Sequence, residues 1–159
     1  MYPDGATNRN FEDAESAHFF TTPYQPFDNW SAHRVKLWGR EFATVEHGYH
    51  WRKFSETAPD VAELVLEAPS AWATWQISRE HAKKRRPDWD EVKIGIMREL
   101  LVAKLEQNED VRERLAASAH KTIIEDSPWD SFWGLGPKGD GENMMGRLWM
   151  ELREGLVNV

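Results

Sequence analysis

The sequence predicts an α+β domain that is mainly helical, with a few short strands. Several segments repeat apolar residues every three or four positions, which is the spacing of an amphipathic helix. Runs typical of strands are short and isolated, at residues 17–20, 35–37 and 122–124. Because no repeat or linker divides the chain, we expect residues 1–16 to be a loose polar lead-in and residues 17–159 to form one domain.

The composition narrows the functional classes. The 159 residues include nine tryptophans and seven phenylalanines, which favours a packed core and a pocket that stacks flat ligand groups. A net charge of −7 argues against a general nucleic-acid binder, although a local basic patch is compatible with it. The chain has no cysteine, and it has no apolar run of signal-peptide or membrane-span length. We therefore expect a cytoplasmic protein with no membrane partner.

The first half is expected to begin with the strand at 17–20 and a turn-rich loop. Two prolines in the loop at residues 21–30 predict consecutive turns. A small hairpin follows at residues 35–43. Thr44 is a suitable N-cap for a helix that runs through Phe54.

Two shorter helices are expected next. Pro59 and Asp60 begin one that ends near Leu66. Ser70 can cap the second, which reaches about Arg85 and ends in the basic run HAKKRRP. Cations at a helix C-terminus complement the helix dipole, but the same run also fits a phosphate or nucleic-acid patch.

The second half contains the clearest helix. The residues at 88–91, DWDE, follow the D-x-x-E capping pattern, and apolar residues recur behind them at core spacing. The members of that apolar stripe are Val92, Ile96, Leu100 and Ala103. A short helix restarts at Asn108, a strand is expected at 122–124, and Asn143 can cap a last amphipathic helix.

The helix at residues 44–54 is the strongest candidate site. Glu46, Tyr49, His50 and Lys53 lie three or four positions apart and therefore share a face, which large rings flank. Ionisable groups among rings have the shifted pKa values that a reactive site needs. A solvated polar face has the same spacing, so spacing alone leaves both interpretations open. The run EHGYH departs from the H-E-x-x-H zinc pattern, and we predict neither a metal site nor a cofactor.

Residues 125–143 form the most irregular segment. Gly134, Gly136 and Gly139 spell G-x-G-x-x-G, but Pro137 interrupts the motif and the next helix is expected only near Met144, so a dinucleotide-binding site is rejected. A phosphate-holding loop and a plain surface loop both fit the segment. Asp130 lies among tryptophans, where a carboxylate can be desolvated and act on a substrate.

Six stretches, in order, resemble the YbiA-like family, also called NADAR, and cover nearly all of the chain after the lead-in. They are HFF (18–20), PFDNW (26–30), EFATVEHGYHWRKF (41–54), RPDWDEVKIGIMRELLVAKLEQN (86–108), EDSPWDSFWGLG (125–136) and ENMMGRLWMELR (142–153). Three positions depart from the family's pattern. Ser78 stands where a glycine is usual, Leu105 where a phenylalanine is usual, and Asp126 where a small residue is usual. These departures bear on substrate details more than on the fold.

The resemblance implies a YbiA-like fold and an N-glycosidase that cleaves the bond between ribose C1′ and a nitrogen. It implies as substrate a riboflavin-pathway ribosylamino intermediate or an ADP-ribosylated guanine base. The expected partner is then a small ribosyl or ADP-ribosyl molecule, or a modified nucleic acid. A lysine that forms an imine with the opened ribose is part of the chemistry that the resemblance implies. The alternative is a non-catalytic module that binds ADP-ribose or a nucleotide.

The family's motifs carry over onto two groups of residues in this chain. We predict that Lys53 is the nucleophile, that Glu46 moves protons, and that Asp130 stabilises the cation that develops at C1′. The predicted substrate-binding residues are Trp30, Asn29, His47, Arg79, Trp133, Gly134 and Asn143. Lys104 on the long helix is the other lysine that the sequence leaves open as the reactive one.

Overall fold

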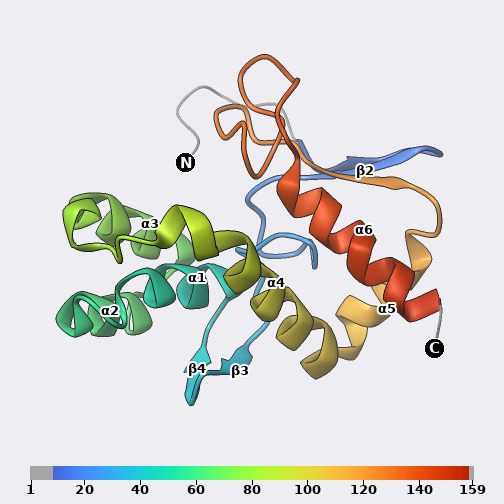
Figure 1. Cartoon of the computed structure of the whole chain (residues 1–159). Helices are drawn as coiled ribbons and strands as arrows, with labels where there is room; N and C mark the ends of the chain where they lie inside the picture. Colours follow the sequence, from blue (N-terminus) through green and yellow to red (C-terminus); the bar gives the residue numbers. More distant parts are fainter. Residues whose placement is uncertain (1–8, 158–159) are drawn as a thin grey trace. The chain divides into compact units, whose positions relative to one another are not determined.

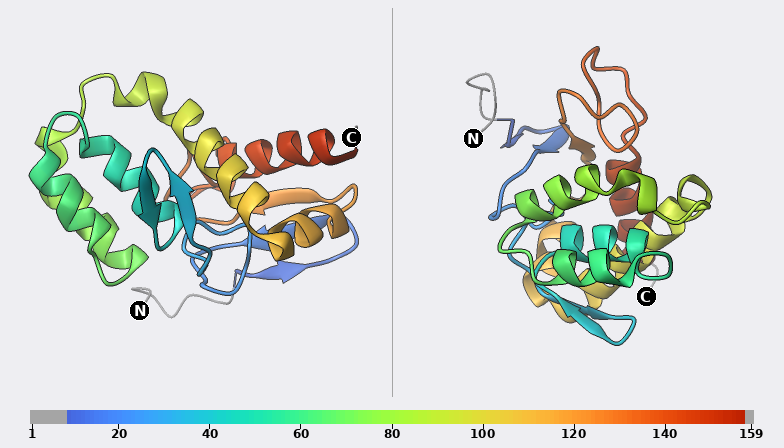
Figure 2. Two further views of the ribbon diagram at one scale, coloured as in Figure 1. Left: turned by 90° about the horizontal axis from the view of Figure 1, so that it is seen from below. Right: turned by 90° about the vertical axis from the view of Figure 1, so that its left-hand side faces the viewer.

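The computed structural model describes residues 9–157, which divide into two compact units (Figures 1 and 2). The first unit contains the described residues up to Asp28 together with those from Asp110 onwards, and the second unit spans Asn29–Glu109. Helices predominate and the strands are short, so the predicted α+β class is confirmed. Residues 1–8, half of the predicted lead-in, lie outside the described residues, whereas Phe11 and Glu12 form a strand.

The second unit is organised around one helix, α1. Its elements are β3 (Val35–Leu37), β4 (Arg40–Phe42), α1 (Val45–Phe54), α2 (Pro59–Leu66), α3 (Ala71–Glu80), the 3₁₀ helix η1 (Ala82–Lys84) and α4 (Trp89–Gln107). Helix α1 contacts α2, α3 and α4, as Figure 1 shows from one side. A side chain on α1 therefore meets another helix on most of its faces.

The predicted hairpin and the predicted cap of α1 are both present. Strands β3 and β4 pair antiparallel around the tight turn Trp38-Gly39, whose φ angles of 53° and 74° lie in the left-handed region. The Thr44 side chain accepts a hydrogen bond from the His47 amide, as an N-cap does. Beneath them, Phe42, Phe54 and Val61 belong to one buried apolar cluster that joins β4, α1 and α2.

The first unit pairs a small sheet with one long helix. Its strands are β1 (Phe11–Glu12), β2 (Ser16–Phe19) and β5 (Thr122–Glu125), and its helices are α5 (Glu109–Ala117), which starts one residue before the unit boundary, and α6 (Met144–Val157). Strand β2 pairs antiparallel with β1 and parallel with β5. Helix α6 packs against β5 (Figure 2), and a Cβ at Gly146 would clash with the Ile123 carbonyl. Glycine is therefore what allows this close approach.

Three local predictions were wrong, each because a competing interaction prevails. The helix predicted to reach Arg85 ends at Glu80 and continues only as η1. The Asp88 carboxylate does not cap α4, because the Arg86 guanidinium binds both of its oxygens, at 2.7 and 3.0 Å. The Asn143 side chain does not cap α6, because its amide bonds the Glu125 amide and the Ile123 carbonyl of β5, each at 2.9 Å.

The packing of α1 against α4 makes a prediction about stability. A Cβ at Gly48 would lie 2.6 Å from Leu100 Cδ2 and 3.1 Å from Phe42 Cδ2, and both of these side chains are fully buried. Overpacking of this kind costs about 1–3 kcal/mol, which exceeds the roughly 1 kcal/mol that alanine gains over glycine in a helix. We therefore expect Gly48→Ala to lower the free energy of unfolding measured in urea.

The matched control is Gly95→Ala on α4. Nothing lies within 4 Å of a Cβ at this exposed position, so the helix-propensity gain of about 0.5–1 kcal/mol is expected without a clash. Equal stability changes in the two variants would contradict the close packing of α1 on α4.

Candidate active site

The polar stripe of α1 is largely buried: Tyr49 and His50 are buried, and Glu46 and Lys53 are half-buried. Only 12% of the Glu46 side chain and 5% of the His50 side chain are exposed. The first turn of α1 is tied to the PFDNW stretch, because the Glu46 amide donates to the Asn29 carbonyl at 3.1 Å. Of the two interpretations that spacing left open, the structure therefore favours the reactive site over the solvated face.

A chain of hydrogen bonds links three members of the stripe to α3. His50 Nε2 lies 2.7 Å from Glu46 Oε1, and Lys53 Nζ lies 3.2 Å from His50 Nδ1. With Glu46 ionised, Nε2 carries the imidazole proton and donates it to the carboxylate, which leaves Nδ1 as an acceptor for the lysine. The lysine also donates to Ser78 Oγ at 2.9 Å.

Two aromatic rings complete the surroundings of the lysine. Lys53 Nζ lies 5.2 Å from the ring centroid of Tyr49 and 5.3 Å from that of Trp89. Both rings are buried and pack edge to face, at a centroid separation of 4.9 Å. The rings shield the amine from water and offer its cationic form only a weak attraction.

Burial shifts the acid–base equilibria of this cluster. Desolvation lowers the pKa of Lys53 from 10.5 to about 8, against the opposing attraction of Glu46 and with added repulsion from Arg85 and Lys93. The pKa of His50 is lowered as well, chiefly by burial and by the charge of Lys53, against the attraction of Glu46. Near neutral pH the imidazole is therefore uncharged, and a fraction of the lysine is a free amine.

Glu46 stays ionised in spite of its burial. Burial alone would raise the pKa of its carboxyl group, but His50, Lys53 and His47 together outweigh that effect, and the pKa is lowered overall. The carboxylate therefore acts as the fixed negative charge of the cluster. It orients the imidazole and attracts the proton that the lysine carries.

His47, predicted to bind substrate, is committed to the fold. Its Nδ1 lies 2.8 Å from Thr44 Oγ1 and its Nε2 lies 3.0 Å from the Ala68 carbonyl. Both ring nitrogens are thus used, and the side chain is buried. The histidine links the cap of α1 to the turn after α2.

The other predicted binding residues of the second unit lie on α3 and in the PFDNW stretch. Asn29 Oδ1 is buried without a hydrogen-bond partner, and its Nδ2 contacts only Met97 Sδ, at 3.6 Å. Trp30 contacts Trp72 at a centroid distance of 6.2 Å. Arg79 lies over another tryptophan of α3. Of these three residues, Asn29 is therefore the one whose side-chain oxygen could accept a hydrogen bond from a substrate.

Asp130, Trp133, Gly134 and Asn143 belong to the first unit. Asp130 Oδ1 accepts hydrogen bonds from the Phe132 and Trp133 amides, at 2.9 and 2.8 Å, so this oxygen holds the turn of the SPWDSFWG segment. A Cβ at Gly134 would lie 2.7 Å from the Glu125 carbonyl, so this glycine serves close packing. The amide of Asn143 is occupied by β5, as described above.

Lys104 differs from Lys53 in its surroundings. Its side chain is fully buried on α4, and Nζ donates to Ser31 Oγ at 2.7 Å. The same hydroxyl lies 2.7 Å from His33 Nδ1. With no exposed surface, this amine cannot meet a substrate without local opening, so the structure favours Lys53 as the reactive lysine.

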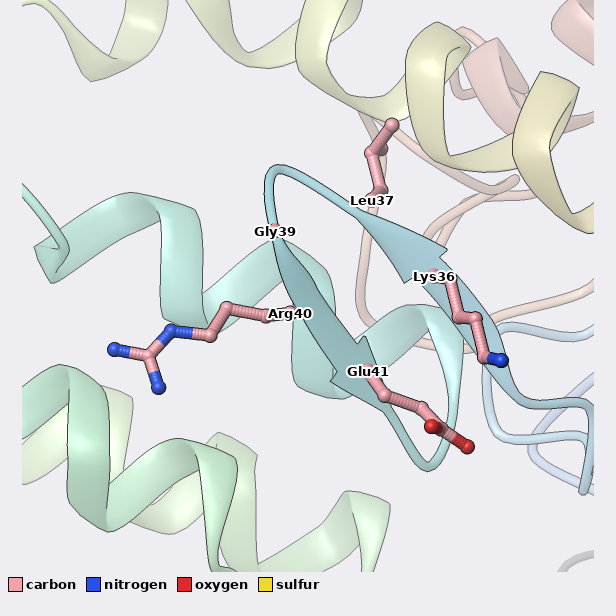
Figure 3. Close-up of a pocket in the computed structure, with 5 residues that line it drawn as sticks. All are labelled: Lys36, Leu37, Gly39, Arg40 and Glu41. Carbon is pink, nitrogen blue, oxygen red and sulfur yellow. The ribbon is translucent and has the colours of Figure 1, made fainter.

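A shallow hollow of about 460 Å³ lies on the β3–β4 hairpin (Figure 3). Its lining residues are Lys36, Leu37, Gly39, Arg40 and Glu41. None of them is a predicted site residue, and Arg40 pairs with Glu63 of α2 at 3.0 Å.

Within residues 9–157, no cluster of three or more His, Cys, Asp or Glu residues is arranged to hold a metal ion. No helix in that part of the chain is long and apolar enough to cross a membrane.

Two members of the cluster were missed as functional residues. Sequence reasoning placed His50 in the stripe but gave it no role, although it bridges Glu46 and Lys53. Ser78 was noted only as a departure from the family's glycine, yet its hydroxyl holds the lysine. The i, i+4 spacing of Glu46 and His50 was a usable signal, whereas nothing in the sequence pairs residue 78 with residue 53.

The low pKa of Lys53 is directly measurable. The lysines are labelled by reductive ¹³C-methylation, and the NMR signal of each labelled amine is recorded as a function of pH. We expect the signal of Lys53 to titrate near pH 8, whereas exposed lysines titrate near their usual value of about 10.4. Because Glu46 opposes the shift, Glu46→Gln is expected to lower the pKa of Lys53 further. A value for Lys53 above 10 in both proteins would mean that the amine is solvated.

Known proteins resemble this chain along most of its length. The NADAR domain family matches residues 11–157. An N-glycosidase of Nostoc punctiforme is 36% identical over 139 residues, which cover 86% of this chain and 88% of that protein. The N-glycosidase YbiA of Escherichia coli is 34% identical over 142 residues, which cover 88% of each chain. A riboflavin biosynthesis protein of Vibrio vulnificus is 30% identical over 146 residues, which cover 92% of this chain but 38% of that one.

A solved structure agrees with these matches. The NMR structure of the E. coli protein YbiA superimposes with a TM-score of 0.79 at 30% identity, covering 94% of this chain and 89% of that one. The expected YbiA-like fold is therefore confirmed. On the strength of the family match and these relatives, the chain belongs to the NADAR family.

Proposed function

We propose that this protein is an N-glycosidase that hydrolyses the bond between ribose C1′ and a nitrogen, with Lys53 as its nucleophile. The supporting observation is a buried lysine whose pKa is lowered to about 8 and whose amine lies 3.2 Å from an uncharged histidine. Such an amine is nucleophilic near neutral pH and has a neighbour that can take its proton. The N-glycosidase names of two relatives support the reaction class.

The substrate is a ribosylamino compound. The relatives include N-glycosidases and riboflavin biosynthesis proteins, which favours an early riboflavin-pathway ribosylamino intermediate. An ADP-ribosylated guanine base carries the same type of bond at C1′ and is the other candidate. In both candidate substrates, a flat ring lies on one side of C1′ and one or more phosphates lie on the other side.

The proposed reaction proceeds through a covalent imine. The lone pair of Lys53 Nζ attacks C1′, the electron pair of the C1′–N bond leaves with the nitrogen, and that nitrogen takes up a proton. The ribose ring then opens as the ring oxygen gains a proton and the lysine nitrogen forms a double bond to C1′. Water adds to the imine and releases both the sugar and the free amine.

His50 and Glu46 handle the lysine's proton in this scheme. His50 Nδ1 is the basic nitrogen within hydrogen-bond distance of the amine and takes its proton, and Glu46 stabilises the imidazolium that forms by accepting from Nε2. Glu46 therefore acts through His50 and not on the lysine itself. Ser78 Oγ fixes the direction of the amine. Asp130, from the first unit, is proposed to stabilise the positive charge at C1′.

The experiment is a panel of ribosylamino and ADP-ribosyl substrates, with the released base and sugar detected by mass spectrometry. We expect Lys53→Ala to abolish release. We expect Glu46→Gln to lower kcat about a hundredfold or more, because His50 without the carboxylate no longer takes the lysine's proton and loss of proton transfer costs that much. Lys36→Ala, an exposed lysine on the hairpin, is the matched control and should keep full activity.

Two results would contradict the proposal. Near-normal release by Lys53→Ala would remove the lysine from the mechanism. Saturable binding of ADP-ribose without release of base from any member of the panel would instead support the non-catalytic binding module.

A further inference from the structure

Helix α3 displays a row of stacked aromatic rings that the proposed chemistry does not use. Trp72 and Trp75 lie 4.9 Å apart at an interplanar angle of 16°, and Arg79 Cζ lies 4.8 Å from the Trp75 centroid. Trp30 extends the row beyond Trp72. We call these four residues the tryptophan row. It is held together by ring contacts from one end to the other.

The tryptophan row lies apart from the buried face of α3. Trp72, Trp75 and Arg79 stand at offsets of 0, 3 and 7, which places them on one face of the helix. Trp72 is 45% exposed, whereas Thr74 and Ser78, on the adjoining face of the helix, are buried. Trp72 is the exposed ring of the stacked pair and offers flat surface to a ligand, whereas Trp75 behind it is half-buried.

Lysine residues follow the Arg79 end of the tryptophan row along the chain. Lys83 and Lys84 of η1 are exposed and make no ion pair within residues 9–157, and neither does Arg79. Their neighbours Arg85 and Arg86 are instead paired with Asp90 and Asp88, at 3.1 and 2.7 Å. The free cations of this basic run therefore gather at the Arg79 end of the tryptophan row.

We propose that the tryptophan row and the cations beyond it form a binding surface for single-stranded nucleic acid. Bases stack on the exposed Trp72 indole and on the Arg79 guanidinium, which Trp75 supports from between them, and the phosphates contact Lys83 and Lys84. A duplex does not fit this surface, because its bases already stack on one another. The overall charge of −7 confines binding to this patch, since the rest of the surface repels a polyanion.

The surface adjoins the candidate active site through one helix. Trp75 and Ser78 stand at i and i+3 on α3, so the tryptophan row passes one helical turn from the hydroxyl that holds Lys53. A strand on the row therefore brings a modified base towards the lysine. That last step rests on the proposed function, whereas binding of an unmodified strand does not.

The test is fluorescence anisotropy with a labelled, unmodified single strand of about 12 nucleotides, titrated at several salt concentrations. We expect Trp72→Ala and Trp75→Ala each to weaken binding about fivefold or more, since stacking contributes about 1–3 kcal/mol per base. Lys83→Glu combined with Lys84→Glu is expected to reduce the salt dependence of binding. These exposed lysines can be changed without touching the core, so this variant tests the surface even if a tryptophan variant unfolds.

The matched control is Trp129→Ala, because Trp129 of the first unit is equally exposed, at 49%. It should bind the strand as the unaltered protein does. No binding by the unaltered protein, or an equal loss in Trp129→Ala, would overturn the proposal. So would self-association that Trp72→Ala abolishes in size-exclusion chromatography, since a second copy would then cover the row. Glycosidase activity on a small substrate is assayed in parallel, so that failure of strand binding is distinguished from failure of the proposed function.

Discussion

The burial of the Lys53 ammonium is the constraint on which the rest of the second unit depends. Lowering its pKa from 10.5 to about 8 corresponds to a cost of about 3 kcal/mol while the lysine is charged. The cost is present in full below pH 8 and disappears as the pH rises towards 10.5, because the folded protein loses this proton before the unfolded chain does. The attraction of Glu46 favours the charged form, and Ser78 Oγ and His50 Nδ1 lie within hydrogen-bond distance of the ammonium. Perturbed pKa values of this kind cluster at functional sites, which supports the choice of this cluster as the candidate active site.

Helix α3 connects this cluster to the surface of the unit. Ser78 on its buried side holds the amine, and the stacked rings of Trp72 and Trp75 form its outer side. One short helix thus contributes both to the reacting group and to the surface that a large substrate would meet first. The Ser78 hydroxyl lies against the Lys53 amine, so this side chain contributes directly to the setting of the lysine.

The local structure followed from the sequence more readily than the site did. Thr44, the hairpin turn and the apolar stripe of α4 act within a few residues of themselves, so their patterns predict the elements that form. Whether the stripe on α1 faces water depends on α3 and α4, and spacing within one helix carries no information about them. The two N-caps that were wrongly predicted, Asp88 and Asn143, also depend on contacts outside their own helix. Arg86 binds the Asp88 side chain and strand β5 binds the Asn143 side chain, and a capping pattern carries no information about either contact.

The identity of the reactive lysine is the central claim, and reduction of the imine tests it most directly. A substrate is incubated with the protein in the presence of borohydride, and the ribose adduct is located by peptide mapping. We predict the adduct on Lys53, whose side chain is half-buried and whose amine has a pKa of about 8. An adduct on Lys104, or continued turnover with no adduct on any lysine, would contradict it.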